Sequence, residues 1–223
     1  AEGSPLLTRF RRKVTVVPLG IDLRPFQEPS PGALAHAAAL GAKAGGPLWA
    51  CVGRLARYKG IDVALGALRD VPGRLVVVGD GPMGPAWRRL AGALGVADRV
   101  DCHGRVTDAE LVGVYRAATA VWFPSITPAE AFGLAQVEAM AAGCPVVNTA
   151  LPGSGVPWVC RDGVAGLTVP TGDPAALAAA ARRLLDEPGL RDRLADGARR
   201  EAGRFDHRTM AAATLAVYRQ VIR

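Results

Sequence analysis

The chain has 223 residues, of which 50% are hydrophobic, and its formal net charge is +7. This is enough apolar material for one large core, and no apolar run approaches the roughly 20 residues that span a bilayer. The four cysteines are widely spaced, and the three histidines lie near no acid-rich cluster. We therefore expect a reduced, cytoplasmic protein with no metal site and no nucleophilic triad.

The excess of cations is compatible with three anionic partners: nucleic acid, a membrane surface or a small ligand. Many of the arginines lie between residues 182 and 200, where they alternate with acids and lack aromatic neighbours that would stack on bases. We therefore expect no nucleic acid partner. Peripheral association with the inner face of the plasma membrane stays open.

Short apolar runs alternate with helical patterns from residue 48 onward. The apolar runs predict strands at residues 48–53, 75–79, 99–103, 120–124, 145–148 and 166–169. The helical patterns predict helices at residues 61–69, 85–94 and 108–117, with another from Gly133. Strands that alternate with helices of about ten residues form parallel sheets covered on both faces. The sequence therefore predicts an α/β fold with a doubly wound, Rossmann-like sheet.

The two ends of the chain do not follow this alternation. Residues 14–18 predict one more strand, and residues 22–43 read as a linker rich in Pro and Ala with little pattern. Amphipathic helices are predicted at residues 173–187, 190–203 and 207–222. We therefore expect three parts: an interdomain segment and linker (1–46), the doubly wound domain (47–204) and a final helix (205–223).

Glycines and polar residues follow several predicted strands, where doubly wound folds bind their ligands. Gly53 and Arg54 follow the first strand, and Lys59 precedes the next helix; Asp80 and Gly81 follow the second strand. Glycine-rich turns are ordinary at such places, so it is their convergence on one sheet edge that predicts a site. Arg54 and Lys59 are placed to contact phosphate oxygens; the alternative is a pair of surface charges.

The segment Glu130-Ala-Phe-Gly-Leu-Ala-Gln-Val-Glu138 places two carboxylates around a helix start. Leu134, Val137 and Ala141 form one buried helical face, and Glu138 lies about 40° from Leu134 around the helix axis. A carboxylate beside an apolar stripe is costly unless something pairs with it.

The helix start itself offers free N–H groups at Phe132, Gly133 and Leu134, which would gather an anion. The segment therefore predicts one ligand with a phosphate at the helix start and hydroxyls for Glu130 and Glu138. The alternative is that Glu130 caps the helix electrostatically and Glu138 pairs with a core arginine.

Several stretches together resemble the retaining glycosyltransferases of family 4, which have two Rossmann-like domains in the GT-B arrangement. The resemblance covers nearly the whole chain, and it includes the last helix with Tyr218. Its motifs are Val16-Val-Pro-Leu-Gly-Ile-Asp22, Gly53-Arg-Leu-Ala-Arg-Tyr-Lys-Gly60, Val78-Gly-Asp-Gly-Pro82, the two-glutamate segment and Glu138-Ala-Met-Ala-Ala-Gly-Cys-Pro-Val-Val147.

The resemblance implies that this chain is the C-terminal, donor-binding half of such an enzyme. Arg54 and Lys59 would hold the donor diphosphate, Glu130 would orient the transferred sugar, and Glu138 would bind the ribose. The resemblance also implies that Gly53, Asp80, Gly81, Phe132, Gly133 and Leu134 line the donor site and that backbone groups near Val106 meet the base. No metal or other cofactor is implied. The chain alone would bind a nucleotide diphosphate-sugar but transfer little, because the acceptor half is missing.

Residues 153–159 depart from the family pattern, since Trp158 stands where Glu is common after Pro. This stretch is more similar to a subgroup that transfers mannose onto bacterial surface polysaccharides or glycolipids, which favours GDP-mannose as the donor. Two rivals remain: a sugar-nucleotide epimerase with the same two-domain architecture, and a domain that only binds nucleotide or a partner.

Overall fold

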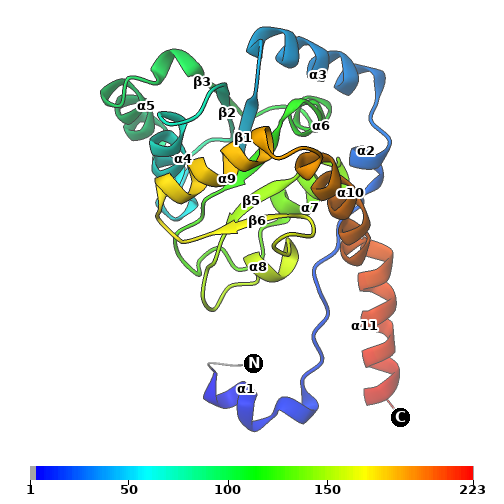
Figure 1. The fold of residues 1–223 in the computed structure, drawn as a ribbon. Coiled ribbons are helices and arrows are strands. Elements are labelled where there is room, and N and C mark those ends of the chain that lie inside the picture. Colours follow the sequence, from blue (N-terminus) through cyan, green and yellow to red (C-terminus); the bar gives the residue numbers. More distant parts are fainter. Residues whose placement is uncertain (1–3, 223) are drawn as a thin grey trace.

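The computed structural model describes residues 4–222 and contains one parallel sheet with the strand order β3-β2-β1-β4-β5-β6 (Figure 1). The predicted doubly wound α/β fold is confirmed, and each predicted strand is present to within one residue at either end. The strands are β1 (Leu48–Val52), β2 (Arg74–Val78), β3 (Val100–Gly104), β4 (Ala120–Phe123), β5 (Val146–Thr149) and β6 (Gly166–Val169).

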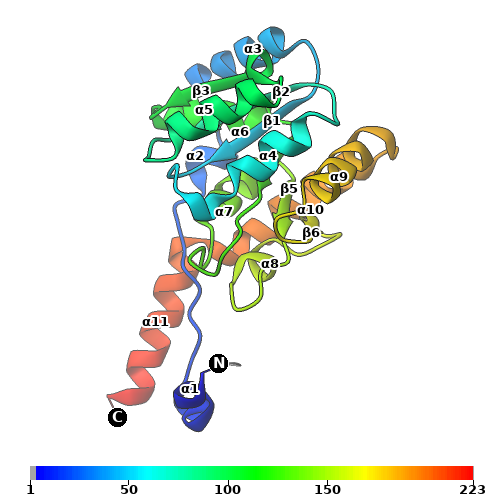
Figure 2. The ribbon, with the colours of Figure 1, turned by 90° about the vertical axis from the view of Figure 1, so that its left-hand side faces the viewer.

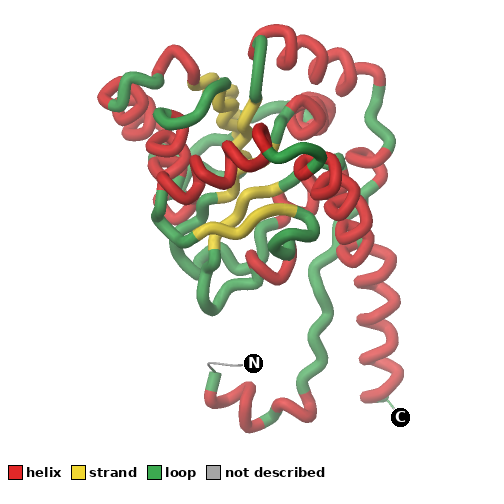
Figure 3. Tube along the Cα trace, in the orientation of Figure 1, coloured by secondary structure: helices red, strands yellow, loops and turns green. Residues whose placement is uncertain are grey.

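Helices cover both faces of the sheet, as the run of wholly buried residues in β1 requires (Figure 3). One face carries α4 (Ile61–Leu68), α5 (Gly84–Ala93) and α9 (Pro174–Asp186). The other carries α3 (Pro31–Ala44), α6 (Asp108–Ala117), α7 (Leu134–Ala141) and α8 (Val156–Val159). The helix α10 (Leu190–Ala202) contributes buried residues to the cores on both faces. Shorter elements are α1 (Pro5–Arg9), α2 (Arg24–Gln27) and the 3₁₀ turns η1 (Arg11–Lys13), η2 (Arg57–Lys59), η3 (Ala97–Arg99) and η4 (Gly203–Phe205).

The strand order reverses at β1, which pairs with β2 on one side and β4 on the other. The chain leaves β1 toward α4 on one face and leaves β4 toward α7 on the other, so the two connections diverge (Figure 2). Trp49 and Trp122 stack across this boundary with ring centroids 4.9 Å apart. In open α/β sheets, the crevice at such a reversal is where ligands bind.

The expected linker at residues 22–43 was wrong. Ser30 caps α3 by accepting a hydrogen bond from the N–H of Ala33, and Leu40 is buried where α3 packs along α6. Alanine is the best helix former, so a run of alanines after a Ser-Pro start predicts a helix rather than a linker.

The strand expected at residues 14–18 was also wrong. These residues lie outside every strand of the described chain, and Val16 is 76% exposed. They run beside α11 (His207–Val221), and both segments project away from the sheet (Figures 1 and 2). Ile21 and Asp206 form a bridge where they leave it. Residues 1–3 and 223, which complete the expected outer parts, lie outside the described residues.

Two helical glycines give a matched test of this packing. Alanine in place of glycine ordinarily stabilises a helix by about 0.5–1 kcal/mol. A Cβ on Gly197 in α10 would overlap the carbonyl oxygen of Val164, whereas one on Gly92 in α5 would lie in open space outside its own helix. We expect Gly92→Ala to raise Tm by about 1–3 °C and Gly197→Ala to lower it, as measured by circular dichroism during heating. A higher Tm in both variants would contradict the packing of α10.

Candidate functional site

Two close approaches bring the loops after β1, β2 and β4 together. Gly79 has φ 125° and Gly60 has φ 64°, both in the region that favours glycine. A side chain on Gly79 would overlap the carbonyl oxygen of Gly53, and one on Gly60 would overlap that of Pro124. The glycines at these strand ends therefore allow the loops to lie against one another.

An open groove of about 600 Å³ lies beside the ends of β1, β2 and β3. Three residues predicted for the site, Arg54, Asp80 and Gly81, line it together with Arg105. Both arginine side chains are exposed, and neither forms an ion pair with another described residue. The groove therefore presents two free cations to a ligand.

Two other residues near this groove differ in how far the sequence indicated them. Arg105 was not among the predicted site residues, although its place directly after a strand was a usable signal. Val106 does not line the groove; its half-buried side chain packs against the core on the α6 face.

Lys59 and Glu130 form an ion pair, with 2.6 Å between Nζ and Oε2 and side chains only 13% and 10% exposed. The buried hydroxyl of Ser125 donates to the same carboxylate oxygen at 3.2 Å. Lys59 Nζ also lies 4.9 Å from the centroid of the Phe123 ring, a cation–π distance. The fold thus brings the two predicted side chains together, but as an ion pair with each other.

The N-terminus of α7 lies next to this pair in the chain, and Gly133 is its N-cap with φ 82°. The backbone N–H groups of Phe132, Gly133 and Leu134 have no acceptor among residues 4–222, so they are available to an anion. The expectation that Leu134 is buried was wrong. It is 39% exposed because, as the first residue of α7, it lies at the strand edge, whereas Val137 packs into the core.

Glu138 accepts a hydrogen bond of 2.7 Å from the hydroxyl of Tyr115. The alternative that it pairs with a core arginine was therefore wrong. Burial raises the pKa of the Glu138 carboxyl, and the Tyr115 hydrogen bond and Lys59 oppose this rise. Tyr115 is wholly buried in α6, and burial raises the pKa of its hydroxyl well above the usual value. Sequence reasoning missed Tyr115 because a tyrosine in a helix gives no sign of which residue its hydroxyl contacts.

The region where the strands end therefore combines cations, free N–H groups and two carboxylates. Such a set can hold a polyanion and, through Glu130 and Glu138, hydroxyl donors. Within residues 4–222, no three His, Cys, Asp or Glu side chains are grouped so that they could hold a metal ion. No helix in the same range is long and apolar enough to cross a membrane.

Comparison with known proteins places these residues in context. Residues 35–201 match the family described as Glycosyl transferases group 1. The chain is 40% identical over 218 residues to a D-inositol 3-phosphate glycosyltransferase of Xylanimonas cellulosilytica, covering 93% of this chain and 51% of that protein. The chain thus spans about half the length of the curated relatives it matches.

Solved structures show the same fold. The sucrose-phosphate synthase of Thermosynechococcus elongatus has a TM-score of 0.80 and 31% identity, over 97% of this chain and 55% of that one. Anabaena Alr3699/HepE in complex with UDP has a TM-score of 0.78 and 24% identity, over 91% of this chain and 55% of that one.

The raised pKa of Glu138 predicts a pH-dependent cost in stability. Its ordinary pKa is 4.5, so just above pH 4.5 the folded protein keeps a proton that the unfolded chain has lost. The cost is absent below pH 4.5 and reaches its full size once the pH passes the folded pKa. We therefore expect the difference in Tm between Glu138→Gln and the parent to shift in favour of the variant as the pH rises from 4 to 8, as measured by thermal unfolding.

Glu187→Gln is the control for this measurement. Arg183 lowers the pKa of the exposed Glu187 carboxyl, so this variant should gain nothing as the pH rises. A Tm difference between Glu138→Gln and the parent that stays constant with pH would contradict the raised pKa.

Proposed function

This chain belongs to the group 1 family of glycosyl transferases, and we propose that it is the donor-binding domain of a retaining, metal-independent hexosyltransferase. One observation carries the proposal: Arg54, Lys59 and the free N-terminus of α7 lie at the reversal of strand order, around β1 and β4. A nucleotide diphosphate-sugar has the matching parts, namely two phosphates and two sets of sugar hydroxyls.

In this proposal the diphosphate binds between the cations and the helix N-terminus. Arg54 and Lys59 neutralise its oxygens, and the N–H groups of Phe132, Gly133 and Leu134 donate to them. As the bond between the sugar and the diphosphate breaks, negative charge grows on the leaving phosphate, so these donors stabilise the transition state more than the bound donor. Two cations and a helix end then provide the charge that a divalent ion would otherwise supply.

In this proposal, the ion pair between Lys59 and Glu130 holds both side chains in place until the donor binds. Without a ligand, each charge compensates the other in a nearly buried position. A bound phosphate offers Lys59 a second anion, and Glu130 can then accept hydrogen bonds from hydroxyls of the transferred sugar. Glu130 thereby orients the sugar while the anomeric carbon passes through an oxocarbenium-like state and reacts with retention.

Glu138 is proposed to bind the ribose. The Tyr115 hydroxyl occupies Oε2 of Glu138, and the other carboxylate oxygen remains for a ribose hydroxyl. Backbone groups near Val106 meet the base, and Gly53, Asp80 and Gly81 shape the adjoining wall. Trp158 and its neighbours favour mannose as the hexose, hence GDP-mannose.

The acceptor is proposed to bind to another part of the protein, which residues 1–46 and 205–223 would join to this domain. The relatives named as D-inositol 3-phosphate glycosyltransferases suggest a phosphorylated polyol as one acceptor class, beside polysaccharide or glycolipid at a membrane surface. Catalysis requires donor and acceptor to be held together. This chain alone should therefore bind the donor and transfer little.

A thermal-shift panel of GDP, UDP, ADP and dTDP tests donor binding. A ligand at about 100 times its Kd adds roughly 2.7 kcal/mol to the free energy of unfolding, which is about 5–10 °C for a chain of this size. We expect one diphosphate to give such a shift and Arg54→Ala to abolish it. Arg57→Ala, an exposed arginine in the same loop, is the control and should keep the shift. Equal shifts for Arg54→Ala and the parent would contradict the assignment.

Replacing Glu130 separates binding from transfer. Glu130→Gln keeps an oxygen that can accept from Ser125 and Lys59 but removes the negative charge that compensates Lys59, so we expect the Kd for the nucleoside diphosphate to stay the same or fall. In the full-length enzyme, transfer should fall by at least about 100-fold, because a neutral amide accepts sugar hydroxyls less strongly. Calorimetry measures the first quantity and a product assay the second. Undiminished transfer would remove the role proposed for Glu130. The variant should melt at a lower temperature because Lys59 loses its anionic partner, so folding is checked by a single cooperative transition well above the assay temperature.

A further inference from the structure

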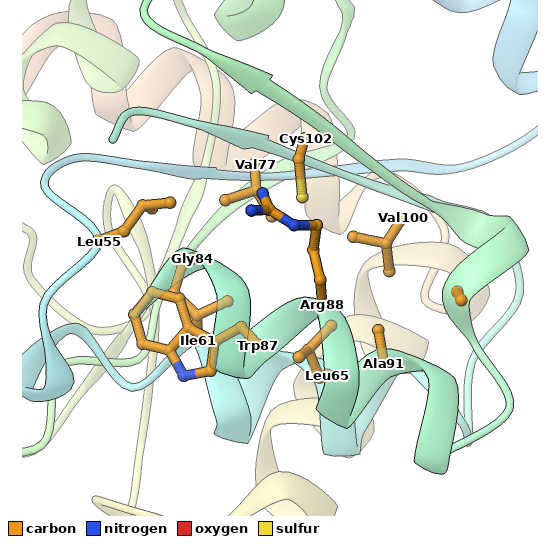
Figure 4. Close-up of a pocket in the computed structure, with 11 residues that line it drawn as sticks. Leu55, Ile61, Leu65, Val77, Gly84, Trp87, Arg88, Ala91, Val100 and Cys102 are labelled. Atoms are coloured by element: carbon orange, nitrogen blue, oxygen red, sulfur yellow. The ribbon is translucent and has the colours of Figure 1, made fainter. Parts of the chain in front are cut away.

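A second cavity, distinct from the open groove, lies between α4, α5 and the edge of the sheet (Figure 4). Its volume is about 240 Å³. Most of its wall is apolar, and it includes Ile61, Leu65, Val77, Trp87, Ala91 and Val100. None of the residues predicted for the donor site lines it.

Two polar side chains face this cavity, Arg88 from α5 and Cys102 from the edge strand β3. Figure 4 shows Arg88 reaching from the helix toward Val77 and Cys102, and its guanidinium interacts with the Cys102 thiol. One guanidinium nitrogen also lies 3.8 Å from where a Cβ of Gly84 would be. The positive charge is thus held at the first turn of α5.

Arg88 has no acidic partner among the described residues. A guanidinium over an apolar cavity would gain from a carboxylate, which it can hold with two parallel hydrogen bonds. The positive end of the α5 dipole adds to this attraction, because the guanidinium lies at the helix N-terminus. The positive charge of Arg88 therefore favours an anionic group, and the apolar walls favour a ligand in which that anionic group is attached to a hydrocarbon chain.

The volume limits the size of that body. An apolar cavity of about 150 Å³ accepts benzene, with six carbons. On the same scale, 240 Å³ accommodates roughly eight to ten carbons. We propose that this cavity binds a medium-chain carboxylate, with the acyl chain between α4 and α5 and the carboxylate on Arg88. This goes beyond donor binding, although Leu55 in the cavity wall directly follows Arg54 and would bring the two ligands close together.

Cys102 provides a direct readout, because it is exposed while Cys51, Cys144 and Cys160 are buried. Octanoate in the cavity should cover the thiol and slow its alkylation by N-ethylmaleimide at least tenfold at saturation. Each methylene buried should lower Kd by a factor of about four. Butyrate, which is four methylenes shorter, should therefore bind on the order of 200-fold more weakly, and octanol should protect less than octanoate at equal concentration.

Three variants distinguish the parts of the proposal. Arg88→Met keeps an apolar stem but removes the charge, so it should abolish the advantage of octanoate over octanol. Arg89→Met is the control, because this neighbouring arginine does not line the cavity, and it should behave like the parent. Ala91→Leu should fill the cavity and remove protection by every chain length.

Each alkylation rate is referred to the same variant without ligand, and melting curves verify that each variant folds. The proposal is overturned if octanoate does not slow the alkylation of Cys102, if octanol protects the parent equally, or if protection survives Ala91→Leu. Because the readout needs no nucleotide, these outcomes are independent of the diphosphate panel.

Discussion

The ion pair between Lys59 and Glu130 joins the two loops that leave β1 and β4, where the chain turns toward opposite faces of the sheet. Neither charge is well solvated, so removing one partner would cost about 3–5 kcal/mol. The loops are held in register by the N–H of Ile126, which donates to the carbonyl of Tyr58 at 2.8 Å, and by the close approach of Gly60 to Pro124. The geometry of the site at the strand ends depends on this contact between the two loops.

The two carboxylates of the site lie in different electrostatic surroundings. Glu130 has a cation within ion-pair distance, whereas Glu138 has a tyrosine hydroxyl and is raised in pKa by burial. A carboxylate paired with a cation can release it in part when an anionic ligand binds the same cation. A carboxylate held by a rigid neutral donor keeps its orientation. The first suits a group that responds to a ligand, and the second suits one that recognises it.

The parallel sheet, its strands and most helix bounds could be predicted from sequence, because apolar periodicity and βα alternation are local signals. The pairing of Lys59 with Glu130 and of Tyr115 with Glu138 could not, because each joins residues more than 20 positions apart through side-chain geometry. The segment containing α3 failed differently: its alanines carried a helix signal that low polarity and prolines obscured. The Arg88 cavity gave no sequence signal, since it arises from imperfect packing between α5 and an edge strand.

The stacked indoles of Trp49 and Trp122 also give the protein an optical property. Their rings are 4.9 Å apart and inclined by 17°, and both are wholly buried on neighbouring strands. Two chromophores so close couple their electronic transitions, and the coupling depends on their mutual orientation. Trp122 also borders the small hollow beneath Arg54 and Lys59. The near-ultraviolet circular dichroism of the chain therefore reports on the packing of β1 against β4, where the two halves of the sheet meet, without any added label.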